Sequence, residues 1–302
     1  MFHAFPKMAF LTQLERVASA VEARLDSLLP QGQSQGPAGL GQAMRYAVLG
    51  GGKRLRPLLL IESARLFGVP DTDALAAACA LECVHCYSLV HDDLPSMDDD
   101  AVRRGRPTLH LTFDEATAIL AGDALLTLAF EILSDPDTHD DPAIRAELVF
   151  LLAKAGGWQG MAQGQALDLS PDRQAFNAHD IATMQALKTG ALFRFACEAG
   201  AVQGRAAPAE RAALLAYASA FGQAFQLADD LLDAQGDAAA LGKAVAKDEA
   251  RGKATLVALL GPEAAKARLA ALVAEAESAL APFGAKAATL IEAARFVAER
   301  RA

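Results

Sequence analysis

An acidic run, HDDLPSMDDD at residues 91–100, follows an apolar stretch, and five of its ten residues are carboxylates. Neighbouring carboxylates repel one another and are costly to remove from water, so a buried cluster of them requires a cation. Oxygen ligands suit Mg²⁺, which commonly bridges a few carboxylates to the phosphates of a substrate. The run predicts a magnesium site, with an acidic loop in solvent as the alternative.

A second acidic cluster lies in QLADDLLD at residues 226–233. On an α-helix Asp229 and Asp233 are about 40° apart on one face, and Gln226 joins that side. The surrounding run GQAFQLADDLLD is otherwise apolar, so an acidic face there would be buried and costly unless a metal occupied it. Two such helices facing each other would enclose a cavity for a cluster of divalent ions.

Basic residues accompany both acidic clusters, and each taken alone is readily explained as a solvated surface charge. They are Lys53, Arg54 and Arg56 in GGKRLRP, Arg103 and Arg104 in AVRRGRP, Lys188 in an otherwise apolar helix, and Lys243, Lys247 and Lys253 after the second cluster. Arginine forks and lysine point charges are the groups that bind polyanions such as diphosphate. Together with two aspartate clusters they predict a site for two diphosphate esters.

Three cysteines in the spacing C-x3-C-x2-C, namely Cys79, Cys83 and Cys86, offer a competing interpretation as an iron–sulfur site. On a helix the first and last of these thiols are about 10.5 Å apart along the axis, too far to share one cubic cluster. No alternation of strands and helices surrounds them, as a barrel of that enzyme class would require. We therefore expect small cysteines buried in a helix core.

Composition and charge narrow the class of protein. The chain has 302 residues, of which 53% are hydrophobic and 6% aromatic, and its formal net charge is −9. A sequence pI near 5.2 argues against nucleic acid and anionic membrane as partners. The N-terminus lacks the apolar run of an export signal, and no stretch approaches 18 uninterrupted apolar residues. We expect a cytoplasmic protein without a membrane span.

Apolar spacing is helical along nearly the whole chain, which predicts an all-α, single-domain helical bundle spanning residues 1–302. Breaks are expected at 30–41, 134–142, 156–164, 203–208 and near Pro282 and Gly284. The predicted helices cover residues 11–29, 40–50, 57–67, 73–91, 115–133, 143–155, 180–201, 209–233, 263–280 and 286–299. The stretch 234–252, mixed in Ala, Gly and charge, is a candidate lid.

Five motifs in order, GGKRLRP, HDDLPSMDDD, GQALDL, KTGALF and QLADDLLD, resemble those of the trans-prenyltransferases, the isoprenyl diphosphate synthases. The similarity runs from about Met44 to Gly261 and is strongest to bacterial short-chain members that form farnesyl diphosphate. The resemblance implies the isoprenoid synthase fold, a helical bundle around a central cavity, and usually a homodimer. It also implies Mg²⁺-dependent condensation of isopentenyl diphosphate with dimethylallyl or geranyl diphosphate, releasing diphosphate.

The resemblance assigns roles by position. Asp92, Asp98 and Asp229 would hold Mg²⁺, supported by Asp93, Asp168 and Asp233. The allylic diphosphate would be bound by Arg103, Lys188 and Lys243, with Lys253 close by. Isopentenyl diphosphate would be bound by Lys53, Arg56, His85 and Arg104. Thr189 and Gln226 would flank the nascent carbocation and the path of the transferred proton.

Product length in this family is generally set by bulk just before the first acidic motif, which points to Tyr87 and Ser88. An aromatic residue at the position of Tyr87 is typical of members that stop at the C15 product, so we expect C15, with C20 as the competitor. On an ideal helix Tyr87 is about 140° from Asp92, so spacing alone does not place both on one cavity.

Two departures and two alternatives accompany the resemblance. Where the family commonly has GKxxGKD this chain has GKAVAKD, with Ala246 for Gly, and Tyr-Pro does not follow Thr255. Both bear on closure of the lid and on the role of Lys253.

A catalytically silent prenyl-diphosphate-binding subunit would have lost an Asp or Lys, whereas both clusters and Lys188 are intact. A terpene cyclase or head-to-head condensing enzyme would have no use for GGKxxR.

Overall fold

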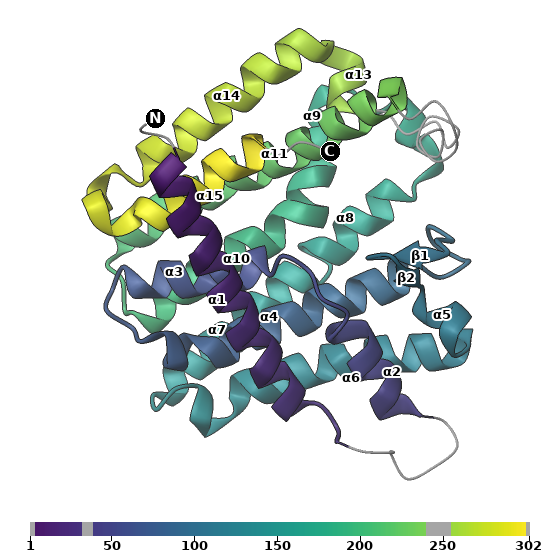
Figure 1. Ribbon diagram of the computed structural model, residues 1–302, viewed down its shortest axis with the longest axis vertical. Helices are drawn as coiled ribbons and strands as arrows, with labels where there is room; N and C mark the ends of the chain where they lie inside the picture. Colours follow the sequence, from purple (N-terminus) through teal and green to yellow (C-terminus); the bar gives the residue numbers. More distant parts are fainter. Residues whose placement is uncertain (1–3, 32–38, 240–254, 300–302) are drawn as a thin grey trace.

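The computed structural model describes residues 4–31, 39–239 and 255–299, and this part of the chain folds into a bundle of α-helices (Figure 1). The helices are α1 (Ala4–Leu28), α2 (Leu40–Val48), α3 (Leu55–Arg65), α4 (Asp71–Asp92), α5 (Leu109–Thr112), α6 (Glu115–Ser134), α7 (Pro142–Gly156), α8 (Met161–Asp168), α9 (Ala178–Gln185), α10 (Ala191–Gln203), α11 (Pro208–Ala239), α13 (Leu256–Leu260), α14 (Pro262–Ala279) and α15 (Ala288–Ala298). Short turns of 3-10 helix are η1 (Pro136–Thr138), η2 (Pro171–Ala175) and η4 (Ala281–Ala287). The all-α prediction is confirmed.

Three details of the predicted secondary structure were wrong. The predicted break at 156–164 contains the start of α8 at Met161, and the predicted continuous helix 180–201 is interrupted by a π-helical turn, η3 (Ala186–Gly190). No strand was predicted, yet β1 (Val102–Arg103) and β2 (Arg106–Pro107) form a small antiparallel hairpin. Its two turn residues, Arg104 and Gly105, both have positive φ, which is the backbone of a tight two-residue hairpin turn. Each difference lies beside a predicted site motif.

Helix α4 is central to the bundle and packs against α6, α3, α1 and α10 (Figure 1). Small Ala and Cys side chains let these helices approach closely, and most of α4 before Tyr87 is buried. Burial raises the pKa of Cys79 and of Cys86 to about 12, so both stay protonated thiols inside the helix core. This arrangement agrees with the expectation of buried core cysteines.

Two helices in the described ranges, α4 and α6, are long and apolar enough to cross a membrane by length and composition alone. The apolar window of α4 is 67% buried and that of α6 is 44% buried in the bundle. A core helix passes the same test, and packing on several sides accounts for the composition of α4. The exposed part of α6 includes Ile119 and Leu120.

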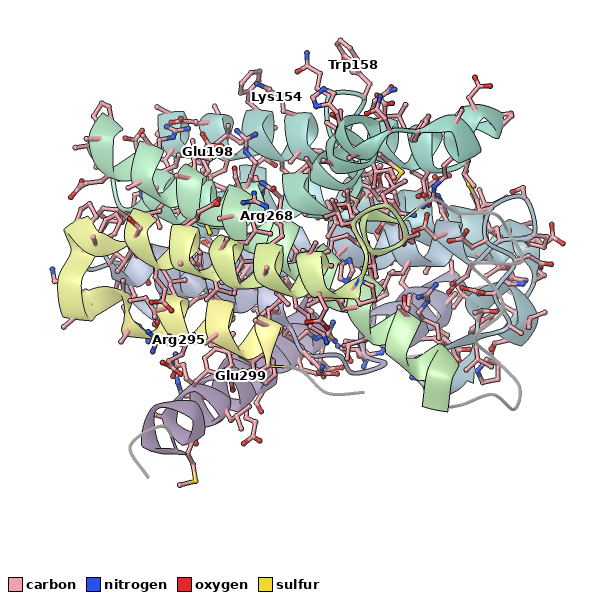
Figure 2. The ribbon with its side chains drawn as sticks, turned by 90° about the horizontal axis from the view of Figure 1, so that it is seen from above. Lys154, Trp158, Glu198, Arg268, Arg295 and Glu299 are labelled. Carbon is pink, nitrogen blue, oxygen red and sulfur yellow. The ribbon has the colours of Figure 1, made fainter. Side chains whose placement is uncertain are left out.

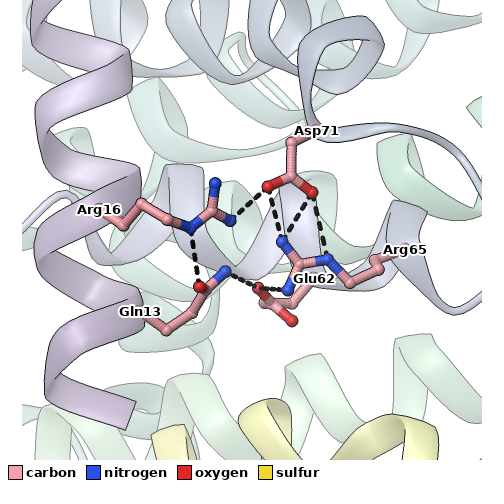
Figure 3. Close-up of polar contacts among 5 residues, drawn as sticks. All are labelled: Gln13, Arg16, Glu62, Arg65 and Asp71. Atoms are coloured by element: carbon pink, nitrogen blue, oxygen red, sulfur yellow. Dashed lines mark hydrogen bonds and ion pairs between the residues drawn. The ribbon is translucent and has the colours of Figure 1, made fainter. Parts of the chain in front are cut away.

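A polar network ties α1 to α3 and to the start of α4 (Figure 3). The Arg65 guanidinium donates to Asp71 at 2.6 Å and to Glu62 at 2.7 Å. Glu62 also accepts from the Gln13 amide at 2.6 Å, while Arg16 pairs with Asp71. Burial raises the pKa of Glu62, and the arginine beside it opposes that shift. The network fixes how α1 crosses the two helices that carry the first site motifs.

The C-terminal helices α14 and α15 pack along α11, which carries the second acidic motif (Figure 1). The buried Tyr217 hydroxyl of α11 donates to the carbonyl of Leu290 at 2.7 Å. Arg295 of α15 pairs with Glu277 of α14 through two contacts, at 2.7 and 3.0 Å. Figure 2 shows Arg295 at the opposite edge of the molecule from Trp158, whose side chain is exposed. These contacts fix the position of α11 in the bundle.

Candidate active site

One cavity of about 430 Å³ is lined by predicted site residues from α3, α4 and η3, and by Met97 from the loop beyond α4. Apolar side chains of α8 and α10, among them Met161 and Leu192, complete its wall. The predicted residues on its lining are Arg56, His85, Tyr87, Ser88, Asp92, Lys188 and Thr189. The structure therefore places Tyr87 and Asp92 on one cavity, which helix spacing alone left open.

The first acidic motif curls back on itself after the end of α4. The backbone N–H of Asp98 donates to the carbonyl of Asp92 at 2.8 Å, which brings the two aspartates together. Burial raises the pKa of Asp92 to about 6; Lys188 opposes this shift and the Asp98 charge adds to it. A carboxylate in this position is unfavourable when ionised unless further positive charge is present.

Asp93 and Arg103 pair with each other on the other side of the motif. Asp93 is buried, and its carboxylate accepts from Arg103 Nη2 at 2.5 Å and from Nε at 3.0 Å. Arg103 also reaches Asp100 at 3.3 Å. Arg103 is the last residue of β1, directly before the hairpin turn, and its side chain points toward these two aspartates. In this arrangement Arg103 neutralises the motif, and its predicted contact with a substrate diphosphate stays a prediction.

Arg104, in the same hairpin, joins the motif to the glycine loop before α3. Its guanidinium donates to the carbonyl of Gly51. Gly52 has φ of 125°, and a Cβ there would lie 2.9 Å from the Arg104 guanidinium carbon, so this position requires glycine. Lys53 follows, exposed, with its ammonium 5.9 Å from the ring centre of Phe296. The loop thus presents Lys53 and Arg104 together at the surface.

Arg54, flanked by two predicted binding residues, has a structural role. It is 2% exposed, pairs with buried Glu82 of α4 at 2.5 Å, and donates to the carbonyl of Val48 at 2.5 Å. An ion pair this deep is costly to break, because either partner alone would be a buried charge. The pair anchors the glycine loop to α4.

Arg56 and His85 form a second contact between α3 and α4, this one on the cavity wall. Arg56 Nη1 lies 3.3 Å from His85 Nε2, and the guanidinium stacks 4.5 Å from the ring centre of Phe193. Burial lowers the pKa of Arg56 to about 10. Burial, together with the Arg56 and Arg104 charges, lowers the pKa of His85 well below its usual range. Since arginine only donates, the neutral imidazole accepts at Nε2.

Lys188 and Thr189 lie in the π-helical turn η3, where an extra residue in the turn redirects side chains. The Lys188 ammonium pairs with buried Asp168 of α8 at 2.7 Å, and Asp168 also pairs with Arg173. An added Cβ at Gly164 would lie 2.1 Å from the backbone nitrogen of Lys188, so α8 and η3 touch backbone to backbone. The motifs GQALDL and KTGALF are therefore one structural unit.

A second, polar cavity of about 150 Å³ shares Lys188 and Thr189 with the first and also includes Asp233. Thr189 Oγ1 donates to Gln226 Oε1 at 3.1 Å, and the Gln226 amide donates to Asp230 at 2.9 Å. The Gln185 amide donates to the other oxygen of Asp230 at 3.1 Å. Burial raises the pKa of Asp230 to about 6 despite both amide hydrogen bonds.

The metal-binding prediction can be tested against donor chemistry. Within residues 4–31, 39–239 and 255–299, no three carboxylate, imidazole or thiol groups form a set that could hold a metal ion. Mg²⁺ commonly takes only one or two carboxylates and completes its shell with water and phosphate oxygens. Asp92 and Asp98, brought together by the backbone hydrogen bond, offer such oxygen donors, whereas Asp229 is not among the lining residues of either cavity. Two carboxylates completed by water and phosphate oxygens suit a divalent cation such as Mg²⁺, and a place for Asp229 in that set stays a prediction.

Sequence reasoning missed several residues of the site. The amide of Gln165 lines the first cavity with both its nitrogen and oxygen buried and without a hydrogen-bond partner. Asp230 and Gln185 organise the second cavity, whereas the helical spacing drew attention to Asp229 and Asp233. The signal for Gln165 was its place in GQALDL beside Asp168.

The predicted residues Lys243 and Lys253 lie outside the described residues, as does Ala246. Of the candidate lid at 234–252, only residues 234–239 are described, and they continue α11.

Comparison with known proteins identifies relatives over most of the chain. Residues 37–283 match the family described as polyprenyl synthetase. The farnesyl diphosphate synthase of Geobacillus stearothermophilus is 42% identical over 85% of this chain and 86% of its own length. Geranylgeranyl pyrophosphate synthase 11 of Arabidopsis thaliana is 40% identical over 96% of this chain and 82% of its own. A crystal structure described as an FPP/GFPP synthase of Zymomonas mobilis superimposes with a TM-score of 0.87 at 45% identity, covering 97% and 99% of the two chains.

The fold, the paired acidic motifs and these relatives define a helical prenyltransferase of the short-chain class. The chain belongs to the polyprenyl synthetase family. The expectation drawn from the five motifs is confirmed at this level.

Proposed function

We propose that this chain, acting as one domain over residues 1–302, condenses isopentenyl diphosphate with dimethylallyl or geranyl diphosphate to farnesyl diphosphate. The observation that carries the proposal is the first cavity, whose lining combines Asp92 and Lys188 with apolar side chains and Tyr87. A charged mouth suits a diphosphate, and an apolar interior suits a prenyl chain. Relatives named farnesyl diphosphate synthase support the same reaction.

In this proposal the cations of the site act on two diphosphates. Lys53, Arg56 and Arg104 bind isopentenyl diphosphate, with neutral His85 orienting Arg56. Lys188, held by Asp168, stabilises the charge that develops on the departing allylic diphosphate, aided by Arg103 when it releases Asp93. Lys243 and Lys253 add charge to the same group. Electrostatic stabilisation of the leaving group is the main contribution of the protein, and no side-chain nucleophile is required.

The allylic cation left behind must be kept from water. Thr189 and Gln226, joined by a hydrogen bond, lie beside it and present oxygen atoms to its positive charge. The unpartnered amide of Gln165 faces the same cavity and can turn its oxygen toward that charge. The released diphosphate is the base that takes the final proton. Addition of the allylic carbon to the double bond of isopentenyl diphosphate thus balances with loss of one proton and one diphosphate.

Magnesium completes the charge balance in the proposal. Asp92, Asp98 and Asp229 would hold it, with Asp93, Asp168 and Asp233 in support. When bound, Mg²⁺ neutralises the allylic diphosphate and improves it as a leaving group. The raised pKa of Asp92, caused first by burial, indicates that its carboxylate benefits from a cation.

The position of Tyr87 on the cavity wall supports the proposed C15 product. Ser88 contributes less bulk there, since its hydroxyl donates to the carbonyl of His85 at 2.8 Å and stays close to the helix. A C20 product is the second candidate, favoured by the relative named geranylgeranyl pyrophosphate synthase.

We further infer a cytoplasmic homodimer. The support is an exposed apolar strip on α6, where Ile119 is 44% exposed and Leu120 55% exposed, which a second copy could cover.

The test is incubation with isopentenyl and geranyl diphosphates, with and without Mg²⁺, followed by chromatography of the dephosphorylated products. We expect a Mg²⁺-dependent C15 alcohol. A C20 main product would correct the chain length only, whereas no elongation in Mg²⁺ would contradict the enzymatic proposal and favour a silent binding subunit.

A further inference from the structure

Tyr87 and His91 form an aromatic pair on one face of α4. They are four residues apart, and their rings meet edge to face with centroids 5.7 Å apart and planes at 80°. Both side chains line the first cavity, whose described lining includes no residue of α6. His91 also contacts Ile119 of α6, so the pair lies where α4 packs against α6.

His91 is fixed in place by α6. Its Nε2 lies 3.0 Å from the carbonyl oxygen of Ile119. A carbonyl only accepts, so Nε2 carries the hydrogen and the ring is held at one tautomer and one orientation. The imidazole therefore meets the Tyr87 ring in one defined orientation. Within the described residues, Tyr87 has no other aromatic contact.

Gly122, three residues after Ile119 on α6, provides the space for the imidazole. A Cβ built there would lie 2.1 Å from His91 Nε2 and 2.5 Å from its Cδ2. Contacts this short cannot exist, so any larger residue would expel the ring from its position. Glycine in the middle of a helix is otherwise unfavourable compared with alanine, which indicates that this one is needed for packing.

We propose that His91 is a positioning residue for product length: anchored to the Ile119 carbonyl in the space left by Gly122, it holds the Tyr87 ring across the end of the prenyl tunnel. This inference deepens the proposed function and rests on it. Tyr87 alone could rotate about its first side-chain torsion and open the tunnel toward α6. The fixed imidazole blocks that rotation, so the two rings act together as the closed end.

The first test compares product lengths of Tyr87→Ala, His91→Ala and the double variant with the unmodified protein. We expect His91→Ala to raise the share of products longer than C15 by about tenfold, the scale on which pocket contacts discriminate by one small group. KM for isopentenyl diphosphate should stay near its original value, because its predicted ligands are untouched. The double variant should resemble Tyr87→Ala, because His91 has no effect on product length once the Tyr87 ring is absent.

The second test uses stability and does not depend on activity. Gly122→Ala should lower the melting temperature by about 5 °C or more, and adding His91→Ala should restore most of this loss by removing the clash. Gly156→Ala, at the end of α7, is the matched control, because its added Cβ would contact Val84 of α4 at an ordinary 3.5 Å. It should change neither melting temperature nor product length.

Two results would overturn the inference. One is a His91→Ala protein that elongates as before and still stops at C15 while Tyr87→Ala proceeds further. The other is a pair of independent, additive length changes in the double variant. Absence of any elongation by the unmodified protein would instead contradict the proposed function, and the stability cycle at Gly122 would still decide whether the imidazole is held there.

Discussion

In the proposed function the first cavity has a charged end that binds diphosphate and a closed end that limits chain length, and the two are built differently. At the charged end, Asp92 of α4 and Lys188 of η3 line the wall, and an ion pair of 2.7 Å with Asp168 of α8 holds Lys188 in place. At the closed end, Tyr87 and His91 come from one helix and are arranged by the close approach of α6 at Gly122. Charge balance governs the first end and shape governs the second. Substitutions at the charged end should therefore change the rate, and those at the closed end should change the product.

The largest effect is expected for Asp92→Asn. Loss of this charge removes a proposed metal ligand next to the leaving group, and we expect kcat to fall by about three orders of magnitude. Steady-state kinetics with geranyl diphosphate measure it, and circular dichroism checks the fold. Asp137→Asn, at an exposed position in η1, is the control and should keep full activity. A near-normal rate for Asp92→Asn would remove Asp92 from the mechanism.

Lys188→Ala should lower kcat/KM for the allylic substrate by about a hundredfold, because a positive charge is lost where negative charge develops. Asp168→Asn should give a smaller loss, since the ammonium remains and only its anchor is weakened. If the two variants were equally impaired, the ion pair rather than the lysine charge would be the important feature of this end. Michaelis–Menten analysis of both variants separates these cases.

At the closed end, Tyr87→Ala should raise the C20 share of the product by about tenfold while total turnover stays close to that of the unmodified protein. The reason is that, in the proposal, the phenol occupies the end of the tunnel and every residue assigned to either diphosphate is left unchanged. Product chromatography at saturating isopentenyl diphosphate measures the ratio. Unchanged C15 output would refute Tyr87 as the residue that limits chain length and would mean that another part of the cavity wall limits it.

The same contrast explains what the sequence could predict. Helix positions follow from apolar spacing, and Asp92 and Lys188 were evident because charged residues in apolar helices require partners. The π-helical turn at Lys188 and the hairpin that pairs Arg103 with Asp93 depend on neighbouring chain segments, so local pattern did not predict them. The buried member of the second cluster is Asp230, because packing of α11 against its neighbours sets which face is turned inward.

The closed end was harder still to predict. Tyr87 was found only through the resemblance, and nothing in the spacing of His91 or Gly122 connects them, since their contact arises where two helices cross. Close packing of this kind depends on distances of a few tenths of an ångström, to which sequence patterns are insensitive.

The smallest expected effect concerns His85, at the charged end. Its pKa is lowered in the folded protein by burial and by Arg56 and Arg104. The unfolded chain takes up this proton near pH 6.5 while the folded chain does not, so stability falls as the pH drops below about 6.5 toward the folded pKa, with a slope of about 1 kcal/mol per pH unit. His85→Gln removes this contribution, so its urea unfolding free energy should depend less on pH between 7.5 and 5. His179→Gln, at an exposed position of α9, should retain the original slope. Parallel curves for the original protein and His85→Gln would mean that the imidazole titrates as freely as in water, and that the charged end is open to solvent.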